Sequence, residues 1–509
     1  MSIELTTRSI GREVTYFNNF VEQSVDCDIT LPDYCPDIMR ILKCTLYNSV
    51  VNSKIIGDRA TADGNVKIRI VYADDKNRIF CYDHDFPFSR YAELNKTYDN
   101  ATVVCRAKTE YANCRAVSKR RIDVHAVVSL HFRVAATDTQ GIISDACGDG
   151  IQLRKKGIEI DDVTAVVTKC FELSQVENVG ENNAGIGKVI DVSASPVLTE
   201  TRIIKGKILL KGELCMRVIY NADDKENETC CLNCNLPFNE IAEANVTDGC
   251  RVDVSLIVNN ANAEPKTDND GDYRYMNLGG EVCAKITAYS PQSIKVVSDA
   301  YSTDVEIETA YQQMEFSKFI HYCNDTVMCK QTLDVSAVGG QKLYSCVAGK
   351  PDCICTFEDD KMYLKGKLPV SLIMLDADGA PVFCEREADF EYNRTIDGAG
   401  RLSCTPQLEI GGCSCNLSSD GKADFRAEIC LNMNVFSTVS EKVLVSLSVP
   451  EGSAKKNKKA SLILCFTSGN ESLWDIARRY DTTVEDIMHE NELSTDYVEN
   501  KTMLMIPVK

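Results

Sequence analysis

The sequence is poor in histidine and lacks the common catalytic motifs. None of its five histidines stands in HExxH, and neither GxSxG nor GxxxxGK followed by Ser or Thr occurs. His125 and His131 have an even separation in a strand-like run without a cysteine or carboxylate at ligand spacing, which favours ordinary strand positions. We therefore expect no enzyme, no metal and no cofactor. A glycosidase-type pair among the 75 acidic residues stays open, because a sequence does not show geometry.

Long apolar runs and an excess of positive charge are also missing. No stretch approaches the ~18 apolar residues of a membrane span, and the first residues carry charges where a signal peptide needs an apolar segment. The formal net charge of −19 disfavours nucleic acid and anionic membrane surfaces, both of which attract lysine and arginine. We expect a cytoplasmic protein without a transmembrane segment.

Cysteine is abundant, with 25 residues. The odd count and the length of the chain argue against a secreted disulfide framework, so reduced, buried thiols are expected. Cys231 and Cys234 form one pair of zinc-ligand spacing, but a structural zinc site needs four ligands and no convincing second pair follows. Pairing of cysteines in a mature assembly stays open.

A strand pattern recurs at intervals of about 150 residues. After Gly64, residues Val66, Ile68, Ile70 and Tyr72 alternate with Asn65, Lys67, Arg69 and Val71, and the same pattern follows Gly212 and Gly366. Phe86-Pro87-Phe88 matches Leu236-Pro237-Phe238, whereas the third copy has Phe390-Glu391-Tyr392 and is the most divergent. Period-2 alternation indicates strands with one buried face.

The predicted fold class is mainly β, with three tandem β-sandwich or open-barrel-like repeat domains and a small βααβ domain. Helical periodicity is scarce before residue 450, and a period of this length is that of a domain, so we expect separate domains in a row. The expected ranges are 1–175, 188–315 and 331–450 for the repeats, 451–459 for a basic linker, and 460–509 for the last domain.

The last fifty residues read as strand, helix, helix, strand. Leu473, Ile476, Ala477 and Tyr480 follow helical spacing, Ser472 and Thr482 or Thr483 are expected caps, and Thr502–Ile506 is the closing strand. The string from Asn470 to Ala477, NESLWDIA, is similar to the LysM family, with Asn470 and Asn500 at positions where that family has glycine. Asparagine tolerates positive φ, so both turns are expected to survive.

The LysM resemblance implies a binding site formed by two loops. That family holds N-acetylglucosamine chains between the first strand-helix loop and the last helix-strand loop. The corresponding residues here are Gly469, Asn470, Glu471, Ser472, Leu493, Ser494, Thr495 and Asp496. Residues 460–509 carry nine acidic and four basic side chains, which suits a protein partner as well as a neutral glycan. Glu471 and Asp496 are expected on exposed turns, and Trp474 in the core.

A second motif lies near the N-terminus. Leu31-Pro32-Asp33-Tyr34-Cys35-Pro36-Asp37-Ile38 resembles the opening of the SPOCS domain of spore-forming Firmicutes, and the arrangement of three repeats with a LysM domain resembles a clostridial family of spore-coat assembly proteins. The resemblance implies a mother-cell protein at the forespore surface whose LysM domain binds the morphogenetic ATPase of the coat basement layer.

Two functions therefore stay open. The first is a non-enzymatic scaffold that recruits this spore-coat ATPase. The second is a cell-wall protein that binds peptidoglycan or a chitin-like glycan, associated with a hydrolase.

Overall fold

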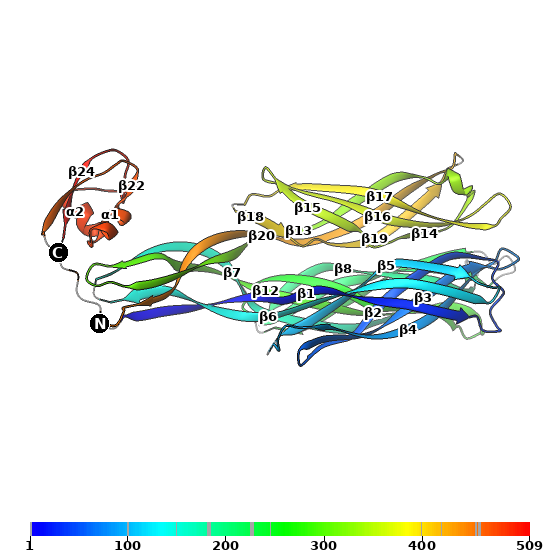
Figure 1. The fold of residues 1–509 in the computed structure, drawn as a ribbon. Helices are drawn as coiled ribbons and strands as arrows, with labels where there is room; N and C mark the ends of the chain where they lie inside the picture. Colours follow the sequence, from blue (N-terminus) through cyan, green and yellow to red (C-terminus); the bar gives the residue numbers. More distant parts are fainter. Residues whose placement is uncertain are drawn as a thin grey trace.

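The chain is built almost entirely from antiparallel strands. The computed structural model describes residues 3–98, 101–148, 150–180, 185–223, 229–244, 246–398, 400–418, 420–452, 456 and 460–508. Strands run to residue 448, with one 3₁₀ turn, η1 (Ser336–Val338), among the described residues, and a small helical domain follows (Figure 1). The mainly β fold class is confirmed. In the described part of the chain, no helix has the length and apolar character to cross a membrane.

Three successive units share one strand plan, in which a long first and a long last strand pair in one sheet. The first unit holds β1 (Glu4–Thr30), β2 (Arg40–Ile56), β3 (Arg59–Ala73), β4 (Ile79–Glu93), β5 (Thr102–Ala116) and β6 (Arg121–Cys147). Its sheets have the orders β1-β6-β5 and β2-β3-β4. The second unit holds β7 (Ile151–Asn178), β8 (Ile186–Ile204), β9 (Lys207–Ala222), β10 (Thr229–Glu243), β11 (Arg251–Thr267) and β12 (Tyr273–Ser302). Its sheets, β11-β12-β7 and β10-β9-β8, repeat the plan.

The third unit follows the same plan with two of its strands divided. It holds β13 (Glu308–Asp334), β14 (Lys342–Ala348), β15 (Asp352–Glu358), β16 (Lys361–Leu375), β17 (Pro381–Thr395), β18 (Arg401–Cys404), β19 (Gln407–Leu417) and β20 (Lys422–Ser448). The strands β14 and β15 correspond to the second strand of the plan, and β18 and β19 to the fifth. This division is the structural form of the divergence seen in the sequence.

Strand pairing bears on where each repeat begins. The expected first domain ended at residue 175, but β7 pairs along its length with β12, from Ile151–Ser302 to Asn178–Tyr275. In the same way β13 pairs with β20 from Glu308 onward. We propose that the second and third repeats begin near residues 150 and 305. The expected linker at 451–459 lies largely outside the described residues.

The glycine that marks each repeat lies under an aromatic ring. Gly64 pairs with Phe88, Gly212 with Phe238, and Gly366 with Phe390 across the two central strands. A Cβ atom at these three glycines would lie only 2.4, 2.4 and 2.3 Å from Cζ of the opposite ring. Glycine is therefore required for this close approach. The register aligns Phe390 with Phe88, the last residue of its motif, and not with Phe86.

The three units are not separate domains in a row, as the sequence suggested; they pack together. Val71, Ile219 and Ile373, each seven residues after the repeat glycine, are buried in one apolar cluster. The alternation had placed Val71 on the solvent face with Lys67 and Arg69, but its exposed fraction is 4%. Burial of this equivalent position in all three copies shows that the repeats converge on a shared contact.

The long strands continue beyond the sandwiches and form a second shared structure, here called the stalk (residues 3–15, 136–148, 150–163, 289–319 and 436–448). Each long pair is irregular where the stalk begins, with Tyr16, Thr164 and Ile320 as the extra residues. Such bulges bend a strand and increase its twist. Beyond them Ile142, Val296 and Val443, one from each repeat, meet in a common core. In Figure 1 the stalk reaches toward the C-terminal domain.

The C-terminal domain has the expected βααβ order. It contains β21 (Leu462–Phe466), β22 (Glu471–Ser472), α1 (Leu473–Arg479), α2 (Val484–Glu490), β23 (Tyr497–Val498) and β24 (Met503–Pro507). The strands β21 and β24 pair antiparallel, and Leu473, Ile476 and Ala477 of α1 are buried as predicted. Thr483 caps α2, whereas the buried Thr482 donates its hydroxyl to the Pro507 carbonyl.

Replacement of Gly64 by alanine should destabilise the first repeat by about 1–3 kcal/mol, because the new methyl group overlaps the Phe88 ring and the Ser49 carbonyl. Gly141→Ala is the matched control, since a Cβ atom there meets no atom within 4 Å. Urea unfolding followed by circular dichroism measures both variants. Equal urea midpoints for the two variants would show that the packing of the Phe88 ring does not require glycine at position 64.

Candidate binding site in the C-terminal domain

The two loops expected to bind a ligand lie side by side. Glu471 pairs with Val498, and Ser472 pairs with Tyr497, in the short β22–β23 ladder. The Leu473 N–H also donates to the Asp496 carbonyl at 2.8 Å. Residues separated by more than twenty positions are thus fixed relative to each other by backbone hydrogen bonds.

The predicted loop residues divide into structural and exposed ones. Glu471 is half-buried, where it accepts the Ser468 N–H at 3.0 Å and lies 3.5 Å from Arg479, so it is not the exposed turn residue that was expected. Ser472 caps α1 by accepting the Trp474 N–H, and the Leu493 N–H donates to Met488.

The exposed loop residues are Asn470, Ser494, Thr495 and Asp496, and Gly469 is half-buried. Asn470 has a positive φ of 57°, whereas the chain bends at Asn500 without a positive φ.

An apolar strip on the β21–β24 sheet escaped the sequence prediction. Leu462, Leu464, Phe466 and Met503 are 47%, 55%, 77% and 50% exposed. Alternation turns Leu462, Leu464 and Phe466 outward while Cys465 points into the core, and Phe466 pairs with Met503. The available signal was an apolar residue at every position of β21, including those of the outer face. A strip of large exposed apolar side chains is typical of a contact surface.

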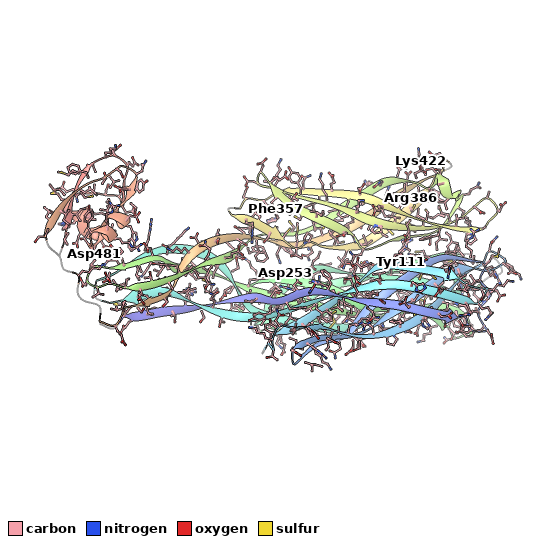
Figure 2. The ribbon with its side chains drawn as sticks, in the orientation of Figure 1. Tyr111, Asp253, Phe357, Arg386, Lys422 and Asp481 are labelled. Carbon is pink, nitrogen blue, oxygen red and sulfur yellow. A yellow bond between two sulfur atoms is a disulfide. The ribbon has the colours of Figure 1, made fainter. Side chains whose placement is uncertain are left out.

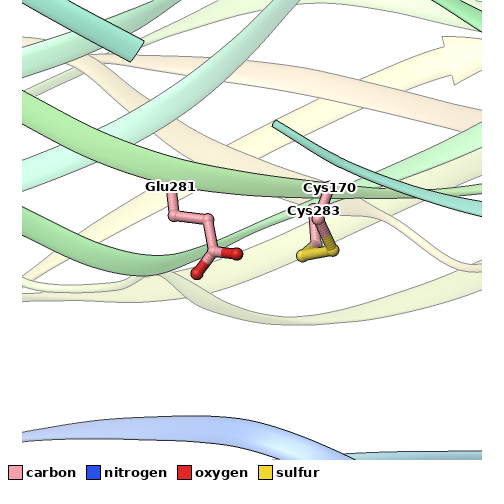
Figure 3. A group of neighbouring side chains, drawn as sticks. All are labelled: Cys170, Glu281 and Cys283. Carbon is pink, nitrogen blue, oxygen red and sulfur yellow. A yellow bond between two sulfur atoms is a disulfide. The ribbon is translucent and has the colours of Figure 1, made fainter. Parts of the chain in front are cut away.

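The histidines and cysteines form no complete metal site in the part of the chain that the structure describes. One group of three possible ligands lies close together there, Cys170, Glu281 and Cys283 (Figure 3). However, Cys170 and Cys283 are joined by a disulfide across β7 and β12, which corrects the expectation that all the thiols are reduced. Cys231 is exposed and Cys234 is buried, so this pair does not share a face.

His125 lies beside two carboxylates, Asp26 on the paired strand β1 and Asp123 two residues earlier on its own strand, whereas the sequence suggested none at ligand spacing. Its Nδ1 lies 2.7 Å from Asp26 and its Nε2 lies 3.2 Å from Asp123. These carboxylates raise the pKa of the exposed imidazole, and the hydrogen bond with Asp26 makes the largest contribution. The arrangement is a surface cluster on the paired strands β1 and β6, which becomes an ion pair when the imidazole is protonated.

Comparison with known families matches both parts of the chain. Residues 37–117 and 185–266 match the family described as SipL, SPOCS domain, and residues 469–507 match the LysM domain. The chain carries SPOCS-domain repeats and a C-terminal LysM domain. The two SPOCS segments cover corresponding strands, β2 to β5 and β8 to β11. Both are families of binding and scaffold domains: the SipL, SPOCS family implies a role in spore-coat assembly, and the LysM domain implies glycan or protein binding. No curated protein and no solved structure matches the chain.

Trp474 forms a contact between the LysM domain and the stalk. Its indole Nε1–H donates to Asp299 at 2.8 Å, and its ring meets Tyr301 edge to face with centroids 4.8 Å apart. Arg478 binds the same carboxylate at 2.9 Å, while the Tyr301 hydroxyl donates to the Thr482 carbonyl at 2.8 Å. The sequence suggested that Trp474 belongs to the core of LysM alone. It is instead half-buried and also forms the contact between LysM and the stalk.

The basic linker adds a further contact. The Lys456 ammonium donates to the Ser302 carbonyl at 2.9 Å and pairs with Asp481, which lies on the side of LysM that faces the stalk (Figure 2). The Lys456 N–H also donates to the Asp304 carbonyl at 2.8 Å. At least this lysine is bound within the chain.

The contact at Asp299 should depend on pH. Burial raises the pKa of its carboxyl, but hydrogen bonds from Trp474 and Tyr311 and the charge of Arg478 outweigh that effect and hold the pKa below its ordinary value. A lowered pKa means that the ionised form stabilises docking above the ordinary value near 3.8, and that this contribution is lost as the pH falls through the lowered pKa.

Asp299→Asn should loosen LysM from the stalk at neutral pH. Trp474 is the single tryptophan of the chain, so its fluorescence reports the contact directly. We expect a red-shifted emission and stronger acrylamide quenching in Asp299→Asn, with no change in the control Glu490→Gln on the exposed end of α2. Identical quenching of Asp299→Asn and the unmodified chain would contradict the docking contact.

Proposed function

We propose that this protein is a non-enzymatic scaffold of the spore coat, and that its LysM domain recruits the morphogenetic ATPase of the coat basement layer. The apolar strip Leu462, Leu464, Phe466 and Met503 carries the proposal. The SPOCS repeats support the coat role, and the expected place of action is the mother-cell cytosol at the forespore surface.

The strip suits a protein partner for two physical reasons. Burying apolar area gives roughly 25 cal/mol per Å², and four large side chains on adjacent strands offer this area without a loss of polar hydration. The β21–β24 sheet has only two strands, and Asn491 occupies the outer edge of β24 through hydrogen bonds with the Met505 backbone, so β21 is the edge strand that a partner segment would pair with. The acidic excess of LysM further favours a partner with basic residues around an apolar centre.

The repeats determine where the LysM domain is held. Three sandwiches share the contact at Val71, Ile219 and Ile373, and they extend one stalk that carries LysM at its end. Docking through Trp474 leaves the strip uncovered, because the strip lies on β21 and β24 whereas Trp474 lies on α1. A scaffold of this form presents one recognition domain at a fixed distance from its own body.

Glycan binding is the second candidate, and the exposed loops support it. Asn470, Ser494, Thr495 and Asp496 offer polar groups between two loops that lie side by side. Sugar hydroxyls bind to such groups through hydrogen bonds. In this case the protein would bind peptidoglycan or a chitin-like glycan through the loops, and the apolar strip would have no role.

Two full-length variants separate these functions. Leu464→Ser with Phe466→Ser removes two of the four apolar side chains of the strip, whereas Thr495→Ala with Asp496→Ala alters only exposed loop residues. In sporulating cells the tagged strip variant should lose its ring around the forespore, and the purified variant should lose at least about tenfold in affinity for the purified ATPase. The loop variant should keep both properties, and circular dichroism checks that each remains folded.

The opposite pattern would overturn the proposal. Retention of the unmodified chain on purified peptidoglycan, abolished by the loop variant and unaffected by the strip variant, would establish the glycan function. An unchanged affinity of the strip variant for the ATPase would remove the strip from the contact.

A further inference from the structure

Cysteines face each other across one edge of two of the three sandwiches. In the third repeat the Sγ atoms of Cys355 on β15 and Cys404 on β18 are 3.1 Å apart. These strands belong to different sheets, so the two thiols bridge the sandwich. Both residues are half-buried and lie at the margin of the repeat core.

The first repeat holds a similar pair, Cys44 on β2 and Cys114 on β5, whose thiols are neighbours where these two strands approach. Neighbouring hydrogen bonds show that β2 and β5 lie close together at this edge of the sandwich. The Asn48 side chain donates to Thr109 at 2.9 Å, and the Ser53 hydroxyl donates to the Val103 carbonyl at 3.2 Å. The second and fifth strands of the plan thus approach each other here.

The third unit carries cysteines at the same two positions, Cys346 on β14 and Cys415 on β19, but there Cys413 is a further neighbour of the buried Cys346. Cys44 pairs with Ile70 and Cys346 with Leu372, each six residues after its repeat glycine.

The opposite positions correspond as well. Cys114 pairs with Val124 and Cys415 with Phe425, each three residues after the start of its long strand. The same two positions therefore carry cysteines in two repeats. In the second repeat Val192 stands at the position of Cys44, since it pairs with Val218.

We propose that Cys44–Cys114 and Cys355–Cys404 are redox modification sites, which a peroxide converts into disulfides that join the two sheets of a sandwich. A disulfide has an S–S distance of about 2.05 Å, so the Cys355–Cys404 sulfurs need to approach by about 1 Å. Two thiols lose two protons and two electrons as the S–S bond forms, and one hydrogen peroxide takes them up to give two waters.

The edge position makes this chemistry accessible. All four thiols of Cys44, Cys114, Cys355 and Cys404 are half-buried, between the fully buried cysteines of the core and the exposed ones. A bond between the sheets closes loops of 70 and 49 residues. Loops of this length restrict the unfolded chain and stabilise the folded one. Oxidation would therefore stabilise the folded repeats through bonds within the chain alone.

Trypsin gives a clean test in the first repeat. Cleavage at lysine and arginine places Cys44 in the peptide 44–54 and Cys114 in the peptide 109–115, each without another cysteine. After treatment of the full chain with hydrogen peroxide and digestion without reductant, mass spectrometry should detect these two peptides joined. Dithiothreitol should separate them, and the thermal midpoint should rise by several degrees on oxidation and fall back on reduction.

Variants extend the test to the third repeat, where the tryptic peptides that contain Cys355 and Cys404, 343–361 and 402–422, each hold three cysteines. Cys404→Ser should remove the Cys355–Cys404 link from a digest with a second protease, while Cys27→Ser, on a half-buried cysteine of β1, should leave every link intact. Detection of the 44–54 and 109–115 peptides only as sulfinic or sulfonic acids, or joined only between different molecules, would overturn the proposal. Failure of a variant to fold would leave the test on the unmodified chain decisive.

Discussion

The burial of one equivalent residue from each repeat is the contact on which the rest of the molecule depends. Val71, Ile219 and Ile373 occupy the same position in the strand plan, and each is apolar on a face that would otherwise meet water. Because they meet in one cluster, the central strands β3, β9 and β16 have a fixed relative position. The bulged long strands then leave the three sandwiches together, and their ends form a single stalk core.

The stalk gives the LysM domain a defined position. A small domain of about fifty residues buries little surface, so a tether alone would leave it free to move. Here Tyr301 belongs to the LysM core although it comes from β12, and Asp299 accepts hydrogen bonds from both Trp474 and Tyr311. Recognition domain and repeats therefore act as parts of one body, and the apolar strip of β21 and β24 stays open for a partner.

Much of the local structure could be predicted from the sequence. Alternation after Gly64, Gly212 and Gly366 identified the central strands, and helical spacing with a cap identified α1, because these signals lie within a few residues of one another. The loop pair at 469–472 and 493–496 was predicted only through the LysM resemblance, and the structure brings the two loops together. A role of these loops in binding stays a prediction.

Contacts between distant segments could not be predicted in this way. Val71 was assigned to the solvent face because its neighbours Lys67 and Arg69 are charged, although a β-branched residue at the same position in all three copies was a usable signal. Trp474 was assigned to the LysM core because its partner Asp299 lies 175 residues earlier. Asp26 was missed as a neighbour of His125 for the same reason, since it comes from the paired strand β1, whereas Asp123 lies only two residues from His125 in the sequence.

The central claim is that the three repeats form one body through the cluster of Val71, Ile219 and Ile373. Hydrogen exchange on the full chain carrying Ile219→Ser tests this claim most directly. Removal of the apolar side chain from β9 should accelerate exchange in β3 and β16, the strands that carry Val71 and Ile373 in the other two repeats. Faster exchange confined to the second repeat, with β3 and β16 protected as in the unmodified chain, would contradict the account and would describe three independent domains.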